Sequence, residues 1–83
     1  MPTGLTLYSR DMCSWCIDAE NYLSERGYQF KVIDVGEDRE AYNEMTQLSD
    51  QTCVPTLVAG EQVLANFDTA QLEKFLSEHG IEP

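Results

Sequence analysis

Short apolar runs and amphipathic helical segments alternate along this chain, and the alternation constrains the fold more than any other feature. The pattern predicts strands at 5–9, 29–35, 56–59 and 62–65, and helices at 14–26, 37–48 and 69–78. The first two strands are joined through a helix, so we expect them to be parallel, whereas Gly60-Glu61 predicts a hairpin between the last two. The sequence therefore predicts an α/β domain of order βαβαββα, with three helices and a four-stranded mixed sheet.

Two helix boundaries carry specific signals. Gly27 follows the first predicted helix, where glycine commonly ends a helix in the left-handed conformation. Asp68, followed three residues later by Gln71, resembles a capping box for the last helix. These signals predict where two of the three helices begin or end.

Length and composition limit the class of protein. The 83 residues suffice for one domain, spanning 1–83, and a hydrophobic content of 42% favours a globular chain. No apolar run approaches the roughly 20 residues that span a bilayer, and the first residues lack the pattern of a signal peptide. Fifteen acidic residues against five basic ones give a net charge of −10, which opposes binding to nucleic acid or an anionic membrane. We expect a cytoplasmic protein.

A pair of cysteines, Cys13-Ser14-Trp15-Cys16, lies at the turn from the first predicted strand into the first predicted helix, with Cys13 at the first turn of the helix. A thiol at a helix N-terminus faces unpaired N–H groups and the positive end of the helix dipole, which favour the thiolate. The thiolate is the nucleophile in disulfide exchange, and Cys16 is close enough to attack a mixed disulfide formed on Cys13. Sites in open α/β sheets lie at the carboxyl ends of strands, where this pair lies. The motif predicts thiol–disulfide chemistry.

The third cysteine, Cys53, leaves several interpretations open. Three cysteines fit poorly with a secreted disulfide scaffold. Cys53 could be a small buried residue, a third redox thiol near Cys13 or a metal ligand. Three thiolates would leave a four-ligand zinc site incomplete, so no metal is expected.

Taken together, these motifs resemble those of the glutaredoxins, small members of the thioredoxin superfamily. The resemblance covers nearly the whole chain, with Cys13-Ser14-Trp15-Cys16 in place of the usual Cys-Pro-Tyr-Cys and Cys53-Val54-Pro55 in place of Thr-Val-Pro. It implies the minimal thioredoxin-like fold and a cis Val54–Pro55 bond. It also implies that the backbone of Val54 pairs with the substrate beside Cys13.

Further substrate contacts are expected around the cysteine pair. Arg10 stands where the family commonly has a lysine, and it could support the thiolate and bind a substrate carboxylate or remain a solvated loop residue. Trp15 is expected to be exposed and to form a wall of the substrate site, although it could also be a hydrophobic plug. Gln51 and Thr52 could contact substrate from their loop or serve only as turn residues.

The resemblance to the family's glutathione site is incomplete. Asp68-Thr69 stands at the paired acidic positions that hold the amino end of glutathione, so one carboxylate remains there, and Asp68 also serves as a predicted helix cap. Ala65-Asn66 replaces the family's Gly-Gly pair before the last helix.

The function that the resemblance implies is an enzymatic one. We expect a glutathione-dependent thiol–disulfide oxidoreductase that reduces protein or glutathione mixed disulfides through Cys13 and Cys16, with a role in electron transport and cell redox homeostasis. One alternative replaces glutathione with thioredoxin reductase as electron donor, and another is an iron–sulfur cluster held between two monomers. The expected partners are glutathione or thioredoxin reductase and disulfide-containing proteins, and we expect a monomer.

Overall fold

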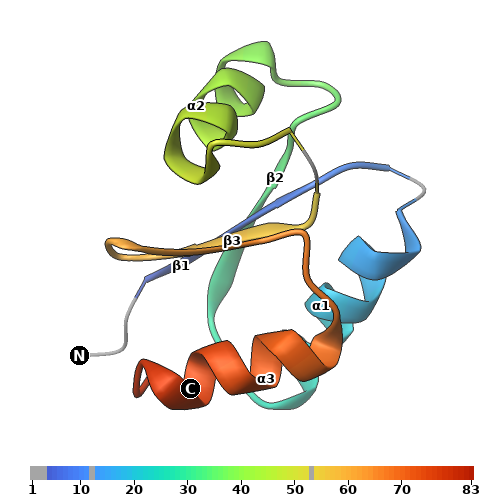
Figure 1. The fold of residues 1–83 in the computed structure, drawn as a ribbon. Helices are drawn as coiled ribbons and strands as arrows, with labels where there is room; N and C mark the ends of the chain where they lie inside the picture. The colour runs from blue at the N-terminus through green and yellow to red at the C-terminus, as the bar shows by residue number, and fades with distance from the viewer. Residues whose placement is uncertain (1–3, 12, 53) are drawn as a thin grey trace.

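Seven elements follow one another in the predicted βαβαββα order (Figure 1). The computed structural model describes residues 4–11, 13–52 and 54–83. The strands are β1 (Leu5–Ser9), β2 (Phe30–Asp34), β3 (Thr56–Ala59) and β4 (Gln62–Ala65). The helices are α1 (Ser14–Glu25), α2 (Arg39–Ser49) and α3 (Thr69–Glu78). Each helix of the described chain is too short or too polar to traverse a lipid bilayer.

The four strands form one mixed sheet in the order β2-β1-β3-β4. β1 runs parallel to β2, with Leu7 opposite Val32, and antiparallel to β3, with Leu7 opposite Leu57. β3 and β4 form the predicted antiparallel hairpin. The sheet therefore confirms both the parallel crossover and the hairpin, and it places β1, which leads to Cys13, in the interior of the sheet.

Helices cover both faces of the sheet, with α2 on one side and α1 and α3 on the other (Figure 1). Successive side chains of a strand point to opposite faces, so neighbours on β1 belong to different cores. Leu7 packs in the cluster shared with α1 and α3, whereas Tyr8 packs with Val35, Ala41 and Met45 under α2. The buried Tyr8 hydroxyl also donates a hydrogen bond to Glu44 Oε1 at 3.0 Å, which ties the sheet to α2.

The helix boundaries follow from their caps. Residue 26 caps the C-terminus of α1, one residue before Gly27 takes a φ of 81°, so the helix is one residue shorter than predicted. α2 begins at Arg39 rather than at the predicted residue 37, because the Asp38 side chain accepts the N–H of Ala41 as an N-cap. The predicted capping box of α3 is confirmed. β2 covers the inner five residues of its predicted range, since residues 29 and 35 lie outside the strand.

Candidate active site

Cys13 is the N-cap residue of α1, at the turn that follows β1. Its Sγ accepts a hydrogen bond from the backbone N–H of Cys16 at 3.2 Å, where a cap oxygen would ordinarily sit. Because the sulfur is partly exposed, an incoming disulfide can reach it. The donated hydrogen bond and the helix N-terminus both stabilise negative charge on the sulfur. Cys13 therefore occupies the position of a nucleophile.

Cys16 lies in the opposite environment, in the first turn of α1 and only 1% exposed. Burial raises the pKa of the Cys16 thiol to about 12, and its interaction with Cys13 acts in the same direction. Both cysteines are free thiols in this structure. The pair is thus divided into an accessible sulfur and a buried thiol that stays protonated at neutral pH.

The loop that precedes β3 comes to the same end of the sheet. The Val54–Pro55 peptide bond is cis, as the resemblance implied. Thr56, the first residue of β3, lies opposite Tyr8, so Pro55 comes beside the carboxyl end of β1. Cys53, which the sequence left open as a third thiol, lies outside the described residues.

A small cavity of about 250 Å³ lies against the start of α1, between Trp15 and the entry to α3. Trp15 is 56% exposed, in agreement with the prediction. Asp68 and Gln71 face the cavity while forming the capping box: Asp68 Oδ1 accepts the N–H of Gln71 at 2.8 Å, and Gln71 Oε1 accepts the N–H of Asp68 at 3.0 Å. Asn66 and Phe67 complete the lining. The structure thus brings the predicted residues Trp15 and Asp68 into one site.

Three of these lining residues were not predicted as site residues. Gln71 was identified only as a helix cap, and Asn66 only as a departure from the family pattern. Asn66 and Phe67 lie between the last strand and the last helix, and Gln71 lies in the first turn of that helix. Their common signal was this place at the sheet end that also holds Cys13. Thr52 and Thr69 are exposed and do not line this cavity.

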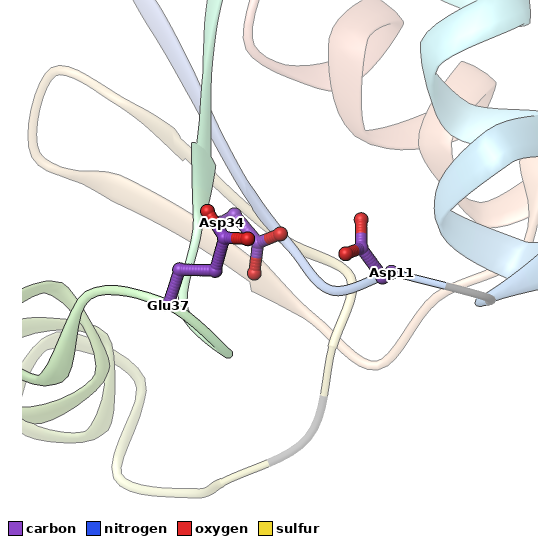
Figure 2. A group of neighbouring side chains, drawn as sticks. All are labelled: Asp11, Asp34 and Glu37. Carbon is purple, nitrogen blue, oxygen red and sulfur yellow. The ribbon is translucent and has the colours of Figure 1, made fainter.

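Three carboxylates gather beside the strand ends, from the segment after β1 and from the end of β2 and the turn beyond it (Figure 2). Carboxylate oxygens of Asp11, Asp34 and Glu37 all lie within 4.8 Å of one another. Asp34 Oδ1 also accepts the N–H of Gly36 at 2.8 Å. Sequence reasoning missed this group because its members are separated along the chain and meet only through the parallel pairing of β1 with β2.

The side chain of Arg10, which the sequence analysis identified as a candidate ligand for a substrate carboxylate, lies near the three carboxylates. A Cβ added at Gly36 would lie 3.4 Å from Arg10 Cγ, so the Arg10 side chain runs past the turn after β2. Arg10 is exposed, and in the part of the chain that the structure describes the one ion pair joins Lys74 to Glu78. Its guanidinium therefore remains available to a ligand.

Comparison with known proteins supports a redox interpretation of this geometry. The family model described as glutaredoxin matches residues 5–64. The chain is 27% identical over 74 residues, covering 89% of this chain and 99% of the relative, to an uncharacterized glutaredoxin-like 8.6 kDa protein in a rubredoxin operon of Clostridium pasteurianum.

Solved structures show the same fold. The thioredoxin-like protein BC3987 is similar with a TM-score of 0.79 and 25% identity, over 87% of this chain and 99% of that one. The glutaredoxin-like protein NrdH-redoxin from Escherichia coli, whose structure is described as the basis of a thioredoxin-like activity profile, gives a TM-score of 0.72 and 24% identity over 86% and 92% of the two chains. The fold is thereby shown to be thioredoxin-like.

Proposed function

The chain belongs to the glutaredoxin family, and on that premise we propose that it is a glutathione-dependent thiol–disulfide oxidoreductase acting through Cys13 and Cys16. One observation carries the proposal. The Cys13 sulfur, at the N-cap of α1, accepts the Cys16 N–H at 3.2 Å, while the Cys16 thiol is buried directly behind it. An accessible sulfur with a donor and a helix N-terminus aimed at it can attack, and a buried thiol one turn away can resolve the product.

The reaction proceeds by two exchanges. The Cys13 thiolate attacks one sulfur of a substrate disulfide, forms a mixed disulfide and releases the other half of the substrate as a thiolate. Cys16 then loses its proton and attacks the Cys13 sulfur, which forms the Cys13–Cys16 disulfide and releases the second thiol. Two glutathione molecules reduce this disulfide and leave as oxidised glutathione. A glutathione molecule can also resolve the mixed disulfide in place of Cys16.

The surroundings of Cys13 supply groups suited to a peptide thiol. The Trp15 ring forms a wall of the cavity, and the Asp68 carboxylate can accept hydrogen bonds from the ammonium group of glutathione. The Arg10 guanidinium pairs well with a carboxylate. In this proposal the backbone of Val54 pairs with the peptide backbone of the substrate beside Cys13.

Thioredoxin reductase is the second candidate reductant, and the side chain of Asn66 is the observation that favours it. Asn66 has a φ of 53°, a conformation that glycine adopts most readily, and it is one of the residues that line the cavity. A glycine at this position would leave that space open. The cavity with asparagine at position 66 is smaller than it would be with glycine, so it would admit glutathione less readily. Reduction by a protein donor such as thioredoxin reductase would not depend on that space.

Turnover with each donor tests the proposal. The purified protein would reduce a glutathionylated peptide in two arms, one with glutathione and glutathione reductase and one with thioredoxin reductase, both followed by loss of NADPH. We expect turnover in the glutathione arm, and Cys13→Ser should abolish it. Turnover only with thioredoxin reductase, together with a gain in the glutathione arm for Asn66→Gly, would establish the second candidate. Silence in both arms, or full activity of Cys13→Ser, would overturn the assignment.

A further inference from the structure

The Gln51 side chain bridges the two ends of the loop that joins α2 to β3. Its Nε2 donates one hydrogen bond to Ser49 Oγ and another to Thr56 Oγ1, each at 3.1 Å. Ser49 is the last residue of α2 and Thr56 is the first residue of β3. One carboxamide therefore links the last residue of α2 to the first residue of β3.

The two anchors of this bridge, Ser49 and Thr56, are hydrogen-bonded or buried within the fold. Ser49 Oγ lies 2.6 Å from the carbonyl oxygen of Met45 and 3.2 Å from that of Gln51. A hydroxyl has one proton to donate, so it goes to the nearer carbonyl, and the oxygen then accepts from Gln51. Thr56 and Met45 are both fully buried. The carboxamide is thus tied at both ends to groups held by the core.

The loop that Gln51 spans leads directly to the candidate active site. Val54 packs against the cluster under α2, and the carbonyl of Pro55 accepts the N–H of Asn66 at 2.9 Å. Asn66 lines the cavity beside Trp15. A shift of the loop would therefore move both the backbone next to the end of β1 and one wall of the cavity.

We propose that Gln51 is a positioning residue, which holds the segment before β3 so that the backbone of Val54 meets the substrate beside Cys13. The inference rests on the proposed function, because it concerns the same disulfide substrate. It gives Gln51 a role through the loop instead of a contact with the substrate. The two roles differ in one respect that can be measured: positioning requires the hydroxyl of Thr56, whereas contact does not.

A double-mutant cycle separates the two roles. Gln51→Ala removes the bridge, Thr56→Val removes one of its anchors while keeping the β-branched shape, and Gln47→Ala on the exposed face of α2 is the matched control. Each variant would be measured for KM and kcat with a glutathionylated peptide and for alkylation of Cys13 by iodoacetamide, which needs no pairing with Val54. Amide hydrogen exchange at Val54 would report the order of the loop directly.

Loss of the bridge should weaken substrate binding and leave the nucleophile unchanged. We expect KM to rise about tenfold in Gln51→Ala and roughly threefold in Thr56→Val, because a net hydrogen bond contributes up to about one factor of ten. The double variant should match Gln51→Ala, alkylation should not change, and exchange at Val54 should accelerate.

Other outcomes would overturn the proposal. A normal KM in Thr56→Val with a raised KM in Gln51→Ala would establish direct contact. Unchanged exchange at Val54 would show that Gln51 does not hold the loop. A wild-type protein inert toward every disulfide would instead overturn the proposed function, and the positioning role with it.

Discussion

At the scale of single residues, the two cysteines of the proposed active site are only three positions apart in the sequence but lie in different environments. Cys13 is accessible and accepts a hydrogen bond at the helix N-terminus, whereas Cys16 is 1% exposed. Burial opposes the charged form of a thiol and so raises its pKa. Cys13 is therefore equipped to attack first, and Cys16 to react only when its target is already bonded to Cys13.

The raised pKa of Cys16 predicts a pH-dependent second step. With a pKa of about 12, the thiolate fraction of Cys16 grows about tenfold per pH unit across the neutral range. Release of a coloured thiol from a mixed disulfide preformed on Cys13 should accelerate accordingly as the pH rises. Stopped-flow absorbance measures this rate, with Cys16→Ser as the control that releases no thiol. A rate independent of pH would mean that another group resolves the intermediate.

The raised pKa of Cys16 also makes the stability of the folded protein depend on pH. The folded protein binds the Cys16 proton more tightly than the unfolded chain does, so the stabilisation is present below the ordinary thiol pKa and is lost as the pH rises toward about 12. Urea unfolding of the reduced protein should show this alkaline loss, and Cys16→Ser should reduce it. An identical pH dependence in both proteins would contradict the burial of Cys16.

The sequence predicted those site residues that belong to one short motif. The cysteine pair and the exposed Trp15 follow from a short motif next to a helix start. Gln51 was named only as a contact or a turn residue, because its hydrogen bond to Thr56 depends on how α2 meets β3. The gathering of Asp11 with Asp34 likewise depends on the register of β1 against β2.

At the scale of elements, the start of α3 has a structural role as a helix cap and, in the proposed function, a second role in binding glutathione. Asp68 caps the helix through Oδ1 and lines the cavity beside Trp15. A carboxylate has a second oxygen and further lone pairs with which to accept hydrogen bonds from a ligand. The two roles can therefore be separated by substitution.

Asp68→Asn and Asp68→Ala make that separation. Asparagine caps a helix about as well as aspartate, so Asp68→Asn should keep the stability of the protein, whereas Asp68→Ala should lose about 1 kcal/mol. Both variants remove the charge, so both should raise the KM for glutathione. Urea unfolding and steady-state kinetics measure the two effects. An unchanged KM in both variants would confine Asp68 to its structural role.

Element boundaries were predicted best where side chains specify them. β3, β4 and α3 begin and end as expected. Short sequence motifs, the Gly60-Glu61 turn and the Asp68–Gln71 capping box, specify these boundaries. α2 was placed two residues early, since residue 37 is helix-compatible but Asp38 makes the cap. The sequence predicted two of the strand pairings in the order β2-β1-β3-β4, the parallel pair and the hairpin. It did not predict that β1 lies between β2 and β3, because hydrophobic periodicity carries no information on which strands are neighbours.

At the scale of the whole molecule, a formal net charge of −10 on 83 residues sets the long-range field. Such a field attracts cationic partners and repels anionic ones, and salt screens it. Two peptide disulfides that differ only in flanking lysines or glutamates should therefore react at different rates. The cationic peptide should react faster at low salt, and the difference should shrink as salt is added.

Stopped-flow rates over a series of salt concentrations measure this effect, and a peptide with uncharged flanks is the control. The rate for the control should change little. Equal rates for the two charged peptides at low salt would show that the net charge of the protein does not affect the rate at which peptide disulfides react with Cys13.

Trapping of the first intermediate tests directly whether Cys13 is the attacking thiol. Cys16→Ser would be incubated with oxidised glutathione, digested and mapped by mass spectrometry. We expect one glutathione on Cys13, and none in the matched Cys13→Ser protein. Glutathione found on Cys53, or no adduct on Cys13, would contradict the assignment of Cys13 as the attacking thiol.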